Sequence, residues 1–284
     1  MLGSSAILID GLEQDQVAVT DRALQSGDGL FETILVQDGR PCLWTRHWAR
    51  LQRGARRFGL TLPSERTLVD ESRRLIPGRD SGILKIILSR GSGGRGYRPP
   101  VVSRARRILS WHPLDSDDGA VAPEGVWVRH CETPVSVNPA LAGLKHLNRL
   151  DSVLARCEWD DPEIAEGLMR DDRGAIVGGT MTNLFLWDGV ALMTPPVDRA
   201  GIAGTVRELV IEMAERAGLR CDIRPLHAAL LEDAAGLFLT NARVGAWPVR
   251  RLGDRDYEPA RLPTAFLDAV RQAAKTPEWP RWVR

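Results

Sequence analysis

A turn signal near the N-terminus constrains the fold of this chain more than any other feature. An apolar run at residues 30–37 ends at Asp38-Gly39, and a second short strand is predicted at residues 41–44. Asp-Gly between two such runs is typical of a tight hairpin, because both turn residues must tolerate a positive φ. We therefore expect paired strands early in the chain.

The rest of the first half fits a small mixed domain around this hairpin. Residues 6–9 predict a further strand, and residues 83–88 form an apolar run, broken only by Lys85, that is typical of a strand buried on both sides. Two helices are predicted between these strands: one with an apolar side that ends at Gly59, and one at residues 64–75. The apolar side of the first helix consists of Trp48, Leu51, Ala55 and Phe58.

The second half predicts more hairpins and one clear helix. Hairpins are expected at residues 166–177 and 183–194, and a strand is expected at residues 237–240. The helix starts near Thr205 and stops at Gly218, and Thr205 with Glu208 fits a capping box.

A polar, acidic and proline-containing stretch at residues 112–123 has the composition of an interdomain linker. We expect an α/β protein of mixed α+β character, with a small N-terminal α/β domain at residues 1–113, a linker at 114–123 and a larger domain at 124–284. The tail from residue 276 is too short to assign.

Composition excludes several classes of function. The chain has 284 residues, a net charge of +1 and 43% hydrophobic residues, so bulk charge predicts no attraction to nucleic acid or to an anionic membrane. No apolar run reaches the roughly 20 residues that span a bilayer. The five histidines show no metal-ligand spacing, and we predict no metal site. The four cysteines are far apart and form no CxxC, which indicates free thiols in a reducing cytoplasm.

Lys145 stands out among the candidate reactive residues. It is one of three lysines among 38 lysine and arginine residues, and it follows a segment rich in proline and glycine and opens a predicted helix. Unlike arginine, a desolvated lysine can lose its proton and attack a carbonyl, so Lys145 is a Schiff-base candidate. Lys85 is the rival, and a solvated surface lysine is the simpler alternative. The apolar positions of the helix are Leu147, Leu150, Val153, Leu154 and Cys157.

Two glycine-rich segments are further candidates for binding. Residues 89–97 combine four glycines with Arg90 and Arg95, and guanidinium groups beside close backbone suit a carboxylate ligand. Residues 201–204 lead into the helix at Thr205, where free amides at a helix N-terminus can hold a phosphate. A flexible surface loop and an ordinary capped helix are the corresponding simpler alternatives.

Taken together, these motifs resemble the class IV aminotransferase family, the fold-type IV enzymes that use pyridoxal 5′-phosphate. The runs at residues 90–97 and 144–150 are most similar to the lyase branch of the family, rather than to its transaminases. The resemblance implies a homodimer in which a small N-terminal α/β domain and a larger C-terminal barrel-like domain hold the cofactor between them. The matching segments are 27–33, 46–51, 89–97, 138–150, 183–185 and 201–207.

The resemblance also implies roles for the residues that contact the cofactor. Lys145 matches the lysine that forms the Schiff base and moves protons, and Arg50 matches the arginine that holds the phosphate. The remaining phosphate contacts match the amides of Thr205 and Val206 and the turn at Asn241-Ala242.

Four more residues take their expected roles from the same resemblance. Arg149 lies where the transaminases have a tyrosine near the ring hydroxyl, and Thr33 matches a threonine beside the reacting carbons. Arg95 and Tyr97 lie where a substrate carboxylate would be received. Arg90, to which the resemblance gives no role, is the next candidate for that carboxylate.

One position departs from the family pattern. Members generally carry a glutamate five residues before the asparagine that is Asn183 here, and that carboxylate keeps the pyridine nitrogen protonated. This chain has Gly178, which supplies no charge. The strength of the cofactor as an electron sink is therefore in question.

The function implied is elimination of an enolpyruvyl group from an amino derivative of chorismate, giving 4-aminobenzoate and pyruvate in folate biosynthesis. Aromatisation of the ring supplies a driving force that transamination lacks, so we expect an eliminating enzyme to tolerate Gly178 better than a transaminase does. Transamination of D- or branched-chain amino acids is the first alternative. A catalytically silent protein that binds pyridoxal phosphate is the second.

Overall fold

The structure is a computed structural model that describes residues 6–114, 124–280 and 282–283. The chain forms two compact units. Unit 1 consists of residues 1–118, 144–148 and 275–284, and unit 2 consists of residues 119–143 and 149–274, in each case where the structure describes them. Of the linker predicted at residues 114–123, residues 115–123 lie outside the described part. The predicted domain limits remain a prediction.

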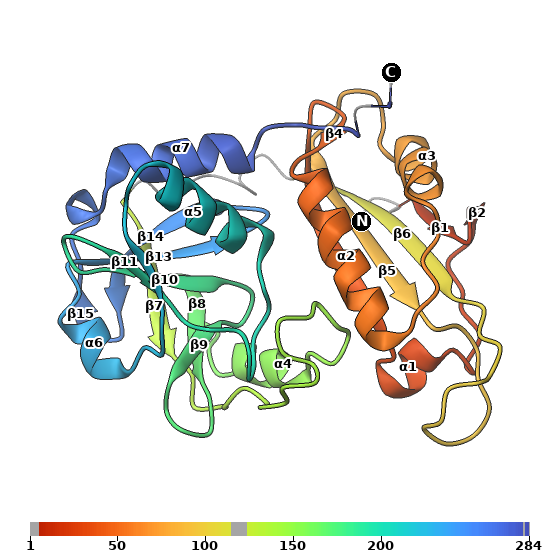
Figure 1. Cartoon of the computed structure of the whole chain (residues 1–284), viewed down its shortest axis with the longest axis horizontal. Coiled ribbons are helices and arrows are strands. Elements are labelled where there is room, and N and C mark those ends of the chain that lie inside the picture. The colour runs from red at the N-terminus through yellow and green to blue at the C-terminus, as the bar shows by residue number, and fades with distance from the viewer. Residues whose placement is uncertain (1–5, 115–123, 281, 284) are drawn as a thin grey trace. The chain divides into compact units, whose positions relative to one another are not determined.

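Unit 1 is a sheet with helices on one face (Figure 1). Its six strands in the described part run in the order β2-β1-β6-β5-β3-β4, and all pairs are antiparallel. Apolar side chains of α2, α3 and every second strand residue form its core. The elements are β1 (Ile7–Ile9), β2 (Leu12–Glu13), α1 (Arg22–Ser26), β3 (Gly29–Gln37), β4 (Arg40–Pro41), α2 (Trp44–Phe58), α3 (Glu65–Leu75), β5 (Gly82–Ser89) and β6 (Arg106–Pro113).

The hairpin that the sequence predicted is present. Asp38 and Gly39 have φ of 50° and 72°, as a type I′ turn requires, and β3 pairs with β4 on either side of them. The second strand is shorter than expected, because Trp44 already opens helix α2. Strand β5 alternates between buried and half-buried residues, so the expectation that both of its faces are fully buried was wrong.

Unit 2 is built on a curled sheet of nine strands among the residues described (Figure 1). The order is β12-β11-β10-β13-β14-β7-β8-β9, with β15 on β14, and the sheet curls because β9 also packs beside β10. Its strands are β7 (Val126–His130), β8 (Ile164–Arg170), β9 (Ile176–Gly179), β10 (Asn183–Trp187), β11 (Leu192–Thr194), β12 (Cys221–Ile223), β13 (Gly236–Asn241), β14 (Gly245–Leu252) and β15 (Arg255–Asp256).

Helices of unit 2 pack on this sheet, with α5 against β13, α7 against β14 and α4 against β8. Both hairpins predicted for this half are present, as β8–β9 and β10–β11. The predicted capping box is absent, since Gly204 rather than Thr205 is the N-cap of α5 and no side chain caps it. The helices are α4 (Leu150–Arg156), α5 (Thr205–Arg216), α6 (Ala228–Glu232), η1 (Pro259–Arg261) and α7 (Thr264–Ala274).

The tail that the sequence left unassigned is part of unit 1. Trp279 packs against Trp44 with ring centroids 5.5 Å apart, and Glu278 N donates to the carbonyl of Pro41 at 2.8 Å. The tail therefore covers the β4–α2 junction.

Candidate functional site

A buried polar cluster lies between β3 and α2 in unit 1. The Glu32 carboxylate is 1% exposed and accepts from Arg50 Nε at 2.9 Å, from Arg50 Nη2 at 2.5 Å and from His47 Nδ1 at 2.6 Å. Glu32 is in mid-strand, and His47 and Arg50 are three residues apart on one helix face, so all three meet by geometry alone. The predicted phosphate ligand Arg50 is thus held rigidly in place.

Electrostatics fixes the protonation states of this cluster. Burial alone would raise the pKa of Glu32, but Arg50 and His47 outweigh burial and lower it to about 2. Burial lowers the pKa of His47, and the charges of Arg50 and Lys145 add to this effect although Glu32 opposes it. The neutral His47 then donates from Nδ1 to Glu32. Its Nε2 is buried and has no hydrogen-bond partner among the described residues.

Lys145 lies in an extended segment beside β3, five residues before α4, so the prediction that it opens this helix was wrong. Its carbonyl accepts from Phe31 N at 2.9 Å, and its ammonium nitrogen is 4.0 Å from the centroid of the Phe31 ring. This half-buried position suits a cation that must be partly desolvated. The other two reactive candidates, Thr33 and Lys85, are neighbours across β3 and β5, and both are half-buried.

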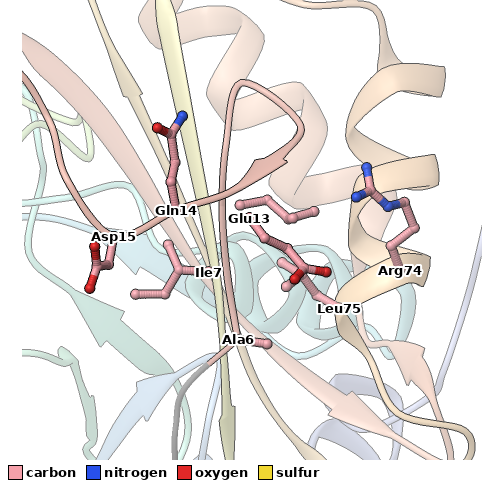
Figure 2. A pocket seen from close by; sticks show the side chains of 8 residues that line it. Ala6, Ile7, Glu13, Gln14, Asp15, Arg74 and Leu75 are labelled. Carbon is pink, nitrogen blue, oxygen red and sulfur yellow. The ribbon is translucent and has the colours of Figure 1, made fainter.

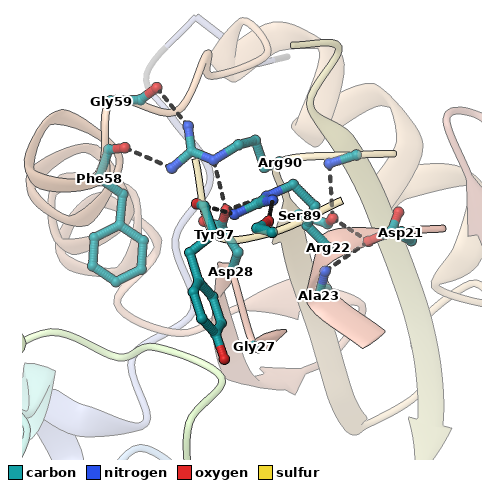
Figure 3. A network of polar contacts seen from close by, with 12 residues as sticks. Asp21, Arg22, Ala23, Gly27, Asp28, Phe58, Gly59, Ser89, Arg90 and Tyr97 are labelled. Carbon is teal, nitrogen blue, oxygen red and sulfur yellow. Dashed lines mark hydrogen bonds and ion pairs between the residues drawn. The ribbon is translucent and has the colours of Figure 1, made fainter. Parts of the chain in front are cut away.

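The glycine-rich loop is held by a network of ion pairs (Figure 3). Arg90 Nε and Arg22 Nε both donate to Asp28 Oδ2, at 2.7 and 2.8 Å. Arg90 also donates to the carbonyls of Phe58 and Gly59, and Arg22 to the carbonyls of Gly96 and Tyr97. Burial would raise the pKa of Asp28, but the two guanidinium groups lower it. All three guanidinium nitrogens of Arg90 are engaged with protein groups, which leaves Arg95 as the better candidate for a carboxylate.

The predicted substrate residues lie at the tip of this loop. Arg95 is exposed and Tyr97 is 89% exposed. Arg22 fixes the loop backbone at residues 96 and 97, so these two side chains project from an anchored base.

In unit 2, the N-terminus of α5 is packed against the start of β10. Asn183 Nδ2 donates to the carbonyl of Ile202 at 2.9 Å, and a Cβ at Gly204 would collide with the Asn183 amide oxygen. Thr205 and Val206 follow as the first helical residues, both buried. Glycine at 204 therefore allows Asn183 to approach the helix terminus.

The turn after β13 lies beside the same place, because Thr240 pairs with Asn183 across β13 and β10. Asn241 Oδ1 accepts from the amides of Arg243 and Val244, both at 2.9 Å, which shapes the turn containing Ala242. Thr240 Oγ1 is buried and no described residue forms a hydrogen bond with it. Elsewhere in unit 2, Arg149 is the N-cap residue of α4, and burial lowers the pKa of its guanidinium.

Gly178 lies near the end of strand β9, opposite Met169 of β8 and just before the turn that leads to β10. A Cβ there would be 2.7 Å from the carbonyl oxygen of Thr182, and Gly179 N donates to that same oxygen at 2.9 Å. A side chain at 178 would therefore require the backbone to move.

The pocket found on the surface of unit 1 lies away from the predicted site residues. A pocket of about 600 Å³ lies beside β1, β2 and α3, lined by apolar residues and by Glu13, Asp15 and Arg74 (Figure 2), and none of the predicted site residues lines it. Within the described ranges, no group of three His, Cys, Asp or Glu residues could hold a metal ion. No helix in the described part of the chain is long and apolar enough to cross a membrane.

Sequence reasoning missed several residues that shape these sites. Glu32 and His47 were not selected, although a glutamate in mid-strand and a histidine three residues before Arg50 were visible signals. Asn183 was missed as well, because its side-chain partner is a backbone carbonyl, which no spacing reveals.

The chain resembles known proteins over most of its length. The family model for amino-transferase class IV matches residues 29–252. An aminodeoxychorismate lyase of Vibrio harveyi is 32% identical, with 85% of this chain and 89% of that protein covered. A bifunctional aminodeoxychorismate lyase/D-amino acid transaminase of Mycobacterium tuberculosis is 31% identical over 88% of this chain and 90% of its own length.

Solved structures agree with this assignment. The crystal structure of 4-amino-4-deoxychorismate lyase from Pseudomonas aeruginosa has a TM-score of 0.87 and 40% sequence identity, and the match covers 94% of this chain and 98% of that one. The fold-type IV architecture predicted from the sequence is thereby confirmed. The chain belongs to the class IV aminotransferase family.

Proposed function

We propose that this chain is an aminodeoxychorismate lyase, which converts 4-amino-4-deoxychorismate into 4-aminobenzoate and pyruvate in folate biosynthesis. The observation that carries the proposal is the similarity to lyases over nearly the whole chain, at 40% identity in the structural match. The loop at residues 89–97 adds support, because its exposed Arg95 suits a substrate that carries carboxylates.

Pyridoxal phosphate is the cofactor proposed, and the residues present fit it. His47 Nε2 and Thr240 Oγ1 are buried polar atoms without a hydrogen-bond partner among the residues described, and the uncapped N-terminus of α5 presents backbone amides. Arg50 would bind the phosphate, as would the amides of Thr205 and Val206 and the turn at Asn241-Ala242. Arg149 would lie near the ring hydroxyl.

The reaction divides into a proton transfer and an elimination. Pyridoxal phosphate, when bound, withdraws the electron pair that deprotonation leaves at the amine-bearing carbon. Lys145 is proposed to remove that proton, with Thr33 beside the reacting carbons. The C–O bond to the enolpyruvyl group breaks, that group leaves as pyruvate after gaining a proton, and the ring becomes aromatic. Arg95 and Tyr97 are proposed to orient the substrate through its carboxylate.

The test is a comparison of two assays on the purified protein supplied with pyridoxal phosphate. With 4-amino-4-deoxychorismate we expect equal amounts of 4-aminobenzoate and pyruvate, and with amino-acid and keto-acid pairs we expect little exchange. Transamination without release of 4-aminobenzoate would favour the alternative of a D- or branched-chain aminotransferase. The bifunctional relative gives that alternative its support.

A homodimer is proposed as the working form. The apolar positions that the sequence assigned to one helix, Leu150, Val153 and Leu154, are all more than half exposed on α4, whereas Ala155 on the other side is buried. An exposed apolar row at this spacing is typical of a surface that a partner covers. Sedimentation equilibrium of the protein and of Leu154→Asp tests whether this surface joins two copies.

Cytoplasmic location is proposed as well, because all four cysteines are unpaired.

A further inference from the structure

Glu166 is the most heavily bonded buried carboxylate of unit 2 among the residues described. It is on β8 with 0% exposure. Oε1 accepts from the amides of Gly167 and Thr180 at 2.9 and 3.0 Å and from Thr180 Oγ1 at 2.6 Å. Oε2 accepts from Met181 N at 3.1 Å and from Thr182 Oγ1 at 3.0 Å. Among the described residues, no arginine or lysine donates to it, so backbone amides and hydroxyls stabilise the carboxylate.

Four of these five bonds come from one short segment, residues 180–182, which joins β9 to β10. Glu166 thus determines the shape of this turn, and the glycines show how tightly it is closed. A Cβ at Gly179 would be 2.6 Å from Glu166 Oε2, and one at Gly178 would be 2.7 Å from the Thr182 carbonyl oxygen. Only residues without a side chain fit at both positions while the turn keeps this shape.

The turn leads directly to the N-terminus of α5. Asn183 follows Thr182, donates to the Ile202 carbonyl at 2.9 Å, and packs its amide oxygen against Gly204. The position of Asn183 depends on the turn before it, and the position of residues 202–204 depends on Asn183. A continuous set of contacts therefore runs from Glu166 to the amides of Thr205 and Val206.

We propose that Glu166 is a positioning residue for the phosphate-binding N-terminus of α5, acting through the turn at residues 180–182 and through Asn183. The inference rests on the proposed function, in which pyridoxal phosphate binds at that terminus. Glu166 touches neither cofactor nor substrate in this role. It sets where the α5 amides point.

Glu166→Gln tests the role with almost no change of shape. The new amide group has two N–H donors and would face the amide and hydroxyl donors of residues 180–182, so at least one of these bonds is lost or the turn shifts. Glu71→Gln is the matched control. Glu71 is a buried carboxylate of unit 1, 6% exposed and bonded to Arg107, so its loss also costs stability without touching α5.

The measurement compares two ligands on the full-length apoprotein. Pyridoxamine 5′-phosphate and pyridoxamine differ only by the phosphate, and neither has the aldehyde that would attach it to lysine. The ratio of their dissociation constants reports phosphate recognition alone, and thermal unfolding reports stability separately. For Glu166→Gln we expect the preference for the phosphorylated ligand to fall at least tenfold while pyridoxamine affinity stays unchanged. Glu71→Gln should unfold at a lower temperature but keep the preference.

An unchanged preference in a folded Glu166→Gln protein would overturn the inference, and so would an equal loss in Glu71→Gln. If Glu166→Gln does not fold, Thr182→Val removes one of the bonds to Oε2, and a smaller loss of preference in the same direction is expected. An unchanged preference in that variant would count against the role. If the unaltered protein does not prefer the phosphorylated ligand, the proposed function itself fails, and that outcome is distinct from the others.

Discussion

Arg50 pairs with the buried Glu32 carboxylate, and it is also proposed to bind the cofactor phosphate. Arg50→Ala should weaken cofactor binding by about 10- to 150-fold, since a charge-assisted contact contributes roughly 1.5–3 kcal/mol. It should also destabilise the protein, because Glu32 is left as a buried charge without its guanidinium partner. Cofactor titration and thermal unfolding measure the two effects separately.

The double variant Arg50→Ala/Glu32→Gln separates them further. It removes the unpaired charge, so stability should largely recover while cofactor affinity stays low. Arg53→Ala, an exposed arginine on the same helix, is the control and should change neither. Cofactor affinity that is unaltered in Arg50→Ala would remove the phosphate role from this residue.

The Glu32 pKa gives a prediction about acid stability. The folded-state pKa is about 2 and the ordinary value is 4.5, so the carboxylate binds protons more readily in the unfolded chain. Its stabilising effect is complete above pH 4.5 and is lost as the pH falls towards 2. The stability difference between the protein and Glu32→Gln should therefore shrink over this range in denaturant titrations. A difference that stays constant from pH 6 to pH 2.5 would contradict the ion pair.

In the glycine-rich loop, the Arg95 side chain is exposed, whereas the Arg90 side chain is buried. Arg95→Ala should raise the substrate KM without lowering the melting temperature, because its side chain is exposed and the loop is held by other residues. Arg90→Ala should instead lower the melting temperature, since it removes hydrogen bonds to Asp28 and to two backbone carbonyls. An unaltered KM in Arg95→Ala would place the carboxylate site elsewhere.

A second prediction concerns Gly178 on β9, which packs against the turn that follows this strand. Gly178→Ala should destabilise the protein by about 1–3 kcal/mol, because its Cβ would press on the Thr182 carbonyl. Gly94→Ala, where a Cβ would meet nothing within 4 Å, is the control. Gly178→Glu should raise transamination relative to elimination only if the turn opens to admit the carboxylate. Unchanged stability in Gly178→Ala would mean that the turn yields easily.

Much of the element order follows from the sequence, because local chemistry determines it. The Asp38-Gly39 turn, the C-cap at Gly59 and the hairpins of unit 2 each depend on a few adjacent residues. What the sequence could not reveal depends on contacts between distant residues, such as Glu166 with the turn at 180–182. The apolar positions of α4 show a third case. Their spacing predicted the helix, but the helix begins only at Leu150, so Leu147 lies outside it. The spacing also could not tell whether the apolar side faces the core of its own unit or the surface.

In the proposed reaction, a single lysine of the molecule forms the Schiff base with the cofactor and transfers the proton. Lys145 and Lys85 both lie in unit 1, Lys85 on β5 and Lys145 in the extended segment beside β3. Lys275 also belongs to unit 1 and lies directly before the tail that packs beside β4. Of these, only Lys145 matches the family lysine and also lies close enough to the Arg50–His47 cluster to lower the pKa of His47. Both the sequence match and the position in the fold therefore favour Lys145 as the reactive lysine.

The most direct test is to reduce the protein with borohydride in the presence of pyridoxal phosphate and to map the labelled peptide by mass spectrometry. We predict the label on Lys145, and we predict that Lys145→Ala loses both the label and the release of 4-aminobenzoate, while Lys85→Ala keeps both. Label on Lys85 or Lys275 in the unaltered protein, with activity retained in Lys145→Ala, would contradict the account.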